Sequence, residues 1–205
     1  MSIKISLTQF LTFSVKASTS AKITYVRGIK SSDYSPAFDY WRSLRTAIQS
    51  VAFEGKDLSY LLEVAEKADE RHRKNYLKDA NKFINFVRSN DVTYFKTGKA
   101  NWSLDDNFSV SASPELGMVI NGTKYCVKLY YKVPSESVKM TKRKLDSMLT
   151  LMHVSNKDFD PEDSKFAVLN LQNGKIITLD KPIGAENTLA LEIEAQNFLD
   201  IWNRI

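Results

Sequence analysis

The hydrophobic residues change their spacing near Asn90, and this change limits the folds open to the chain. Before Asn90, apolar residues recur every three to four positions, which is the period of an amphipathic helix. After it, Phe108, Val110 and Ala112 alternate with polar residues, which is the period of a half-buried strand. A chain with helices first and strands later is expected to form an α+β fold.

The first ninety residues are predicted to be mainly helical. Ser6 and Gln9 have the spacing of a capping box, which predicts a short helix after Ser6. Ser35-Pro36 predicts the start of a second helix, and Asp57 is expected to cap a third. The segment from about Asp69 to Ser89 is predicted to form a fourth helix. The residues from Ser18 to Ser35 have no clear pattern.

The second part is predicted to form a sheet with two helices. Strands are expected at 108–112, 117–120 and 123–133, with Asn121-Gly122 as a type I′ turn, so that 108–133 would form a three-stranded antiparallel meander. A helix at 137–152, strands at 166–171 and 175–179 joined at Asn173-Gly174, and a last helix from Glu186 would follow. The order from residue 69 is then α-β-β-β-α-β-β-α in a mixed or antiparallel sheet.

No repeat or flexible linker divides the chain, so we expect a single domain over residues 1–205. In it, residues 1–68 would be a helical elaboration of an α/β core formed by residues 69–205.

Composition narrows the class of protein. The chain has 205 residues and a formal charge of +5, a mild basic excess that favours an anionic partner only weakly. One cysteine and two histidines exclude an internal disulfide framework and the common four-ligand zinc sites. A secretory leader pattern and an 18-residue apolar window are both missing, which predicts a cytoplasmic protein without a membrane segment.

Several common catalytic motifs do not occur in the sequence. It contains no phosphate-binding G-x-x-x-x-G-K-[ST], no G-x-G-x-x-G and no G-x-S-x-G. His72 and His153 each lack a second histidine four residues later, which excludes the common helical zinc-protease motif. Cys126 lies in an apolar strand, so we interpret it as a buried structural thiol.

One short group of residues carries a likeness to a known family. Pro114-Glu115 precedes the second predicted strand, and Cys126-Val127-Lys128 lies in the third. Val127 and Leu129 would face the core, so Cys126 and Lys128 would face the other side of the sheet. Together with the order α-β-β-β-α-β and its hairpin, this pattern resembles the core of the PD-(D/E)xK nuclease superfamily.

The resemblance implies a metal-dependent endonuclease or a degenerate relative of one. In working members two carboxylates hold Mg²⁺, which activates water, and a lysine supports the nucleophile. Glu115 would then be a metal ligand and Lys128 a catalytic residue, but Cys126 stands where the family has an acidic residue and cannot replace a hard oxygen ligand. The second carboxylate could come from any of five residues, namely Glu63, Glu66, Asp105, Asp106 and Glu136.

Two groups of basic residues point to DNA or RNA as a partner. The first group, spaced along one face of the helix at 69–89, contains Arg71, Lys74, Lys78 and Lys82. The second, in the first turns of the helix at 137–152, contains Lys139, Lys142, Arg143 and Lys144. The helix dipole disfavours cations at that end, and phosphate neutralisation would explain their presence.

A different class of function stays open. The same scaffold could serve a non-catalytic adaptor or inhibitor that binds another protein. An adaptor needs an exposed apolar patch and no metal, whereas a nuclease needs converging carboxylates.

Overall fold

The chain forms two sheets and seven helices, seen in a computed structural model that describes residues 2–31, 39–131, 142–161, 163–179 and 181–205; of residues 142–144 only the backbone is described. The helices are α1 (Leu7–Ser14), α2 (Thr19–Ser31), α3 (Arg42–Glu54), α4 (Tyr60–Lys67), α5 (Glu70–Arg88), α6 (Lys142–Val154) and α7 (Ala185–Arg204). The strands are β1 (Ile3–Ser6), β2 (Val92–Phe95), β3 (Ala100–Asp105), β4 (Phe108–Ser111), β5 (Leu116–Ile120), β6 (Thr123–Tyr130), β7 (Asn156–Lys157), β8 (Lys165–Asn170) and β9 (Lys175–Ile177).

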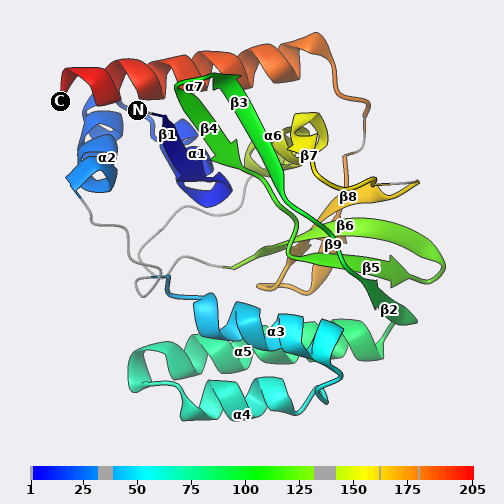
Figure 1. Cartoon of the computed structure of the whole chain (residues 1–205). Coiled ribbons are helices and arrows are strands. Elements are labelled where there is room, and N and C mark those ends of the chain that lie inside the picture. Colours follow the sequence, from blue (N-terminus) through cyan, green and yellow to red (C-terminus); the bar gives the residue numbers. More distant parts are fainter. Residues whose placement is uncertain (1, 32–38, 132–141, 162, 180) are drawn as a thin grey trace.

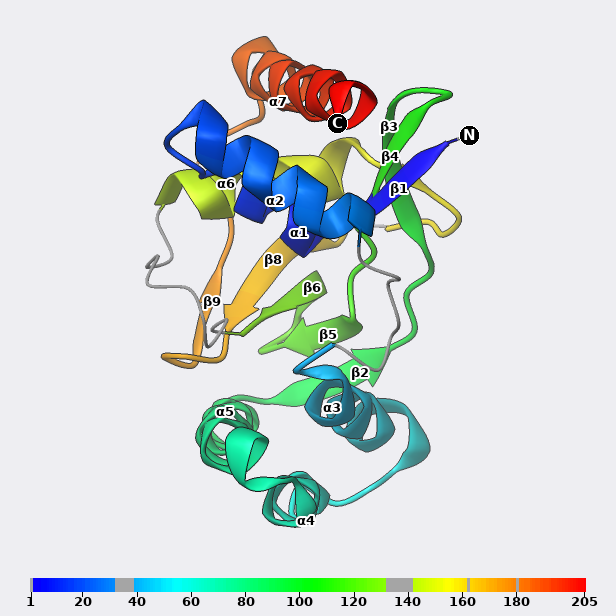
Figure 2. The ribbon, with the colours of Figure 1, turned by 90° about the vertical axis from the view of Figure 1, so that its left-hand side faces the viewer.

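The larger sheet lies between two groups of helices (Figure 1). Its strand order is β2-β5-β6-β8-β9, with β6 and β8 parallel and the other neighbours antiparallel. Helices α3, α4 and α5 lie on one side of it, and α1, α6 and α7 on the other (Figures 1 and 2). The α+β class predicted from the sequence is confirmed.

A smaller sheet stands beside the helices of the second side. Its order is β1-β4-β3-β7, and β1 runs parallel to β4. The predicted meander over 108–133 is therefore wrong, because β4 pairs with β1 and β3 while the β5–β6 hairpin pairs with β2 and β8. Strands β2, β3 and β7 were also not predicted, so the described order from α5 contains eight strands rather than five.

Each side of the larger sheet has its own hydrophobic core. Val127 and Leu129 of β6 pack with Phe83 and Ile84 of α5 in one core. Tyr130, the next residue of β6, packs in the other core. Val127 and Leu129 are buried, as the two-residue alternation predicts.

Local signals set several element boundaries. Ser6 and Gln9 form the predicted capping box, with the Ser6 N–H donating to Gln9 Oε1 at 2.8 Å and the Gln9 N–H to Ser6 Oγ at 3.2 Å. Asn121 and Gly122 both have positive φ angles, 48° and 82°, as a type I′ turn requires.

The predicted start of the second helix differs from the structure. Residues 39–41 are not helical and α3 begins at Arg42, while Ser35 and Pro36 lie outside the described residues. Among the helices in the described part of the chain, none has both the length and the apolar character that a membrane span needs.

Candidate functional site

Glu115 and Lys128 lie where the chain passes from the small sheet to the large one. The Ala112 N–H still donates to the Ala100 carbonyl, as part of the small sheet, at 2.8 Å. Three residues later the Glu115 N–H donates to the Val127 carbonyl at 2.9 Å, which starts the pairing of β5 with β6. Pro114 between them lacks an N–H and is buried, so it can make this change of partner without leaving a donor unpaired.

The structure brings the two predicted site residues into direct contact. Lys128 Nζ donates to Glu115 Oε1 at 2.5 Å and to the Ser113 carbonyl at 2.9 Å. The other carboxylate oxygen of Glu115 accepts from the Leu129 N–H at 2.8 Å. The side chains are only 14% exposed for Lys128 and 11% for Glu115, so water screens the pair weakly.

This geometry gives the pair a clear structural task. Both oxygens of Glu115 and the ammonium group of Lys128 are engaged within the protein, at the crossing point between the sheets. A mostly buried ion pair of this kind is costly to break, because the remaining charge would be left without a partner. The pair therefore fixes the chain at the point where it leaves the small sheet.

Cys126, two positions before Lys128 in β6, is fully buried. Its exposed fraction is 0%, and burial raises the pKa of its thiol. A buried thiol with a raised pKa is a poor nucleophile. The interpretation of Cys126 as a structural residue fits this environment.

The other carboxylates considered from the sequence do not join Glu115. Glu63 and Glu66 are exposed on α4, which lies on the far side of α3 and α5 from the sheet (Figures 1 and 2). Asp105 accepts from the backbone N–H groups of its own turn, and Asp106 is exposed in that turn. Glu136 lies outside the described residues.

The donor set around Glu115 does not fit Mg²⁺. Within the described residues, no group of three or more Asp, Glu, His or Cys side chains is placed to hold a metal ion. Lys128 occupies one oxygen of Glu115, whereas a magnesium site needs one or two free carboxylates. The described surroundings of Glu115 are therefore those of a structural ion pair rather than of a magnesium ligand.

The first basic group forms a continuous face on α5. Arg71, Lys74 and Lys78 are exposed, and Lys82 is half-buried beside the β8–β9 turn, where its Cδ lies 3.9 Å from the position of a Cβ on Gly174. None of these four cations has an ion-pair partner within the described part of the chain. They present positive charge to solvent along the outside of the helix.

The structure extends this face beyond the residues named from the sequence. Asn81, Asn85 and Arg88 are also exposed, and they continue the three-to-four-residue spacing to the end of α5. From Arg71 to Arg88 the face is about 25 Å long at 1.5 Å per residue. The helical spacing of amide and cationic side chains together predicts this longer face, whereas the spacing of cations up to Lys82 predicts only its first part.

The second basic group is only partly described. Lys139 lies outside the described residues, and α6 begins at Lys142. Lys142, Arg143 and Lys144 belong to the first turn of α6, as predicted, and only their backbone is described.

A buried acid on α5 was not predicted from the sequence. Asp79 is 3% exposed, and its Oδ2 atom has no hydrogen-bond partner among the described residues. Burial raises the pKa of Asp79 to about 7, although the nearby Lys78 opposes this shift. The helical spacing of the apolar residues around Asp79 places it on the inner face of α5, and this spacing could have predicted its burial from the sequence.

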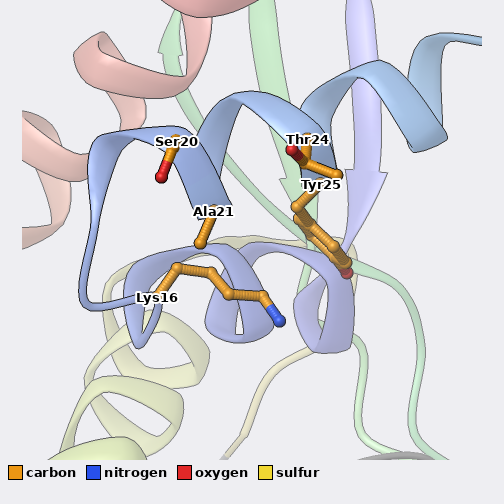
Figure 3. A pocket seen from close by; sticks show the side chains of 5 residues that line it. All are labelled: Lys16, Ser20, Ala21, Thr24 and Tyr25. Atoms are coloured by element: carbon orange, nitrogen blue, oxygen red, sulfur yellow. The ribbon is translucent and has the colours of Figure 1, made fainter.

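A shallow hollow lies beside α2 and is shown in Figure 3. It has a volume of about 390 Å³ and is lined by Lys16, Ser20, Ala21, Thr24 and Tyr25. The ammonium group of Lys16 lies over the Tyr25 ring, 5.2 Å from its centre. The lining contains no carboxylate and no histidine.

No protein-family model matches the chain, and no curated protein matches it. Function is therefore inferred from the residues and their geometry.

Proposed function

We propose that this protein binds DNA or RNA through the outer face of α5, on a scaffold similar to a PD-(D/E)xK nuclease whose catalytic site is degenerate. The observation that carries the proposal is the row of Arg71, Lys74, Lys78 and Lys82, which has no acidic partner in the described part of the chain. Unpaired cations held at a spacing of about 5–6 Å repel one another, and phosphate groups relieve that repulsion.

The composition of α5 supports the proposal. Its acidic residues are Glu70, in the first turn, and Asp79, which is buried. Glu70 is favoured at that end by the helix dipole, and the rest of the exposed face carries cations and amides. Amide side chains beside cations are common on surfaces that contact phosphate and base edges.

The order of the elements supports the nuclease-like scaffold. If the small-sheet strands β3, β4 and β7 are treated as insertions, then α5, β2, β5, β6, α6 and β8 follow one another as α-β-β-β-α-β. The second and third strands of this series, β5 and β6, form a hairpin. Glu115 precedes the second strand and Lys128 lies in the third, which are the positions that the resemblance implies.

The contacts of the Glu115–Lys128 pair support a proposal of binding without cleavage. Both oxygens of Glu115 are engaged in the protein, and buried Cys126 takes the place of the second acid. The catalytic roles of Glu115 and Lys128 stay predictions, which a cleavage assay decides. A protein-contact function has separate support in two exposed apolar residues of α7, Leu189 and Ile193.

The proposal can be tested by fluorescence anisotropy with labelled single strands and duplexes of DNA and RNA. Binding should weaken with salt by about 0.7 to 0.9 log units per decade for each phosphate contacted. The triple variant K74E/K78E/K82E should lose most of the affinity and flatten this slope. The control K4E/K67E/K96E changes the net charge equally at exposed positions outside α5, and should keep the slope.

Two results would contradict the proposal. One is the absence of binding at low salt and micromolar protein. The other is an equal loss of affinity in both triple variants, because that loss would come from net charge rather than from the face of α5.

A further inference from the structure

Helix α5 carries a buried acid, Asp79, next to its basic face. Asp79 is 3% exposed, and its Oδ2 atom has no hydrogen-bond partner among the described residues. Buried carboxylates are normally paired or hydrogen-bonded, because burial removes the water that stabilises the charge. The position therefore favours the protonated, uncharged form of Asp79.

The charged and titratable neighbours of Asp79 come from α5 and from the end of β6. On α5 itself, the charge of Lys78 acts on Asp79 and favours the carboxylate. Just after β6, Tyr131 interacts with Asp79, and its hydroxyl is also buried without a partner among the described residues. Three further charged groups interact with Tyr131, namely Asp39, Arg45 and Glu115. These three are engaged in ion pairs that do not include Asp79, so in the described part of the chain none of them neutralises its carboxylate.

The binding face of α5 runs past Asp79. Lys78 precedes Asp79 in the chain, and Lys82 follows it by three positions, which makes the side chains of Asp79 and Lys82 neighbours on the helix. The β8–β9 turn lies beside Lys82, and its residues 172–174 carry no charge (Figure 2). Neither lysine forms an ion pair with Asp79 or with another described acid. A phosphate group bound by Lys78 and Lys82 would therefore lie close to Asp79.

We propose that the proton on Asp79 regulates nucleic-acid binding by α5: the face binds phosphate tightly while Asp79 is protonated, and less tightly once Asp79 is a carboxylate. The inference rests on the proposed function and adds its regulation. The carboxylate places a negative charge beside two of the lysines, where it repels a bound phosphate. A bound phosphate in turn favours the protonated form, so binding takes up protons. Burial raises the pKa of Asp79 to about 7, and the change of charge therefore takes place near neutral pH.

The distance between the charges sets the size of the effect. A phosphate held by the ends of two lysine side chains would lie about 10 Å from the Asp79 carboxyl, and repulsion at that distance changes an affinity by about two- to fifteenfold, depending on the effective dielectric constant. We expect a change of about fivefold, since the phosphate lies at the surface and the acid in the core.

Fluorescence anisotropy of the full chain at constant low ionic strength tests the proposal. The probe is the labelled DNA or RNA strand or duplex that wild type binds most tightly at about pH 6, made without terminal phosphates because a phosphate monoester itself titrates at about pH 6. Wild type should bind it about fivefold more weakly at about pH 8. D79N, whose amide stays uncharged, should bind at both pH values as wild type does at the lower one. Circular dichroism checks that each protein is folded at both pH values.

Two control variants separate Asp79 from other groups. D91N makes the same substitution at an exposed acid just after α5 and should keep the wild-type difference between the two pH values. H72N removes the histidine of α5, a residue type that changes charge in this pH range, and should keep the difference as well.

Titration calorimetry in buffers of different ionisation enthalpy measures the linked proton directly. For a fivefold effect, wild type should take up about a third of a proton per bound protein at about pH 7, and D79N should take up none. The proton uptake of wild type decides the question even if D79N fails to fold, and its absence overturns the proposal.

The outcomes separate this inference from the proposed function. A wild-type chain that binds, loses affinity in K74E/K78E/K82E and has the same affinity at both pH values overturns the regulation alone. A pH difference that persists in D79N, or disappears in H72N, does the same. A chain that binds no nucleic acid at either pH overturns the proposed function, and this inference with it.

Discussion

The ammonium group of Lys128 lies 2.5 Å from Oε1 of Glu115. This contact links β6, which contains Lys128, to the residue directly before β5, its partner in the hairpin. The same ammonium group holds the Ser113 carbonyl, just after the chain leaves the small sheet. The pair thus joins the two sheets. Its removal should therefore lower the free energy of unfolding, whatever its effect on activity.

Breaking the pair from one side should destabilise the fold. Lys128→Met leaves Glu115 mostly buried without its cation, at a cost of about 3–5 kcal/mol in the free energy of unfolding. The double variant Glu115→Gln/Lys128→Met should lose less than Lys128→Met alone, because no unpaired charge remains. Urea denaturation followed by circular dichroism measures Lys128→Met, Glu115→Gln and the double variant. A double variant that loses the sum of the two single effects would show that the two residues act independently.

The protein should bind nucleic acid without cleaving phosphodiester bonds. We expect no cleavage of single-stranded or duplex DNA or RNA with Mg²⁺ or Mn²⁺, because Glu115 has no free oxygen pair and no converging carboxylate in the described residues. Gel assays with end-labelled substrates test this. Cleavage that is lost in a folded Glu115→Gln variant would restore the catalytic interpretation of Glu115 and Lys128.

Restoring the acid-x-Lys triplet should be costly. Cys126→Glu places a carboxylate at a position with 0% exposure, so it should destabilise the protein by several kcal/mol rather than create a metal site. Cys126→Ala removes one sulfur atom and should cost far less. Thermal melts with and without Mg²⁺ compare the two. A Cys126→Glu variant that is folded and gains melting temperature with Mg²⁺ would contradict this expectation.

Asp79 should make stability depend on pH. Its folded pKa is about 7, whereas the ordinary pKa of an aspartate is 3.8, so the unfolded chain loses this proton at a lower pH than the folded chain does. Its contribution is therefore most favourable below about pH 4, decreases as the pH rises to about 7, and stays low above that. A difference of about three pH units corresponds to about 4 kcal/mol as an upper bound. Asp79→Asn should flatten the profile over this range, measured by urea denaturation between the two pKa values and on either side of them. An unchanged profile in Asp79→Asn would show that other groups set it.

Gly117 should not accept a side chain. An added Cβ would lie 2.4 Å from the Phe95 carbonyl oxygen, and the backbone of the paired strand β2 cannot easily move away. Gly117→Ala should therefore cost about 1–3 kcal/mol. Gly28→Ala is the control, because nothing lies within 4 Å of its Cβ position in α2 and alanine favours helices. Equal melting temperatures for the two variants would contradict this.

Local patterns in the sequence determined many of the elements. The capping box at Ser6 and Gln9, the apolar spacing of α5 and the turn at Asn121-Gly122 each depend on residues within a few positions of one another. The basic face of α5 follows from the same helical period. Such features can be predicted because the interactions that produce them are short in sequence.

The partners of each strand were decided only by the tertiary structure. β1 pairs with β4 although most of the helical half of the chain separates them. β4 does not pair with the β5–β6 hairpin that follows it in the chain, which belongs to the other sheet. The alternation of Phe108, Val110 and Ala112 shows that a buried face exists, but it does not say against which strand or core that face packs. Asp79 likewise became a buried acid, with no partner for its Oδ2 atom among the described residues, only because β6 and α3 enclose the same core as α5. Pairing and burial depend on contacts between distant segments, and these are selected by the free energy of the whole fold.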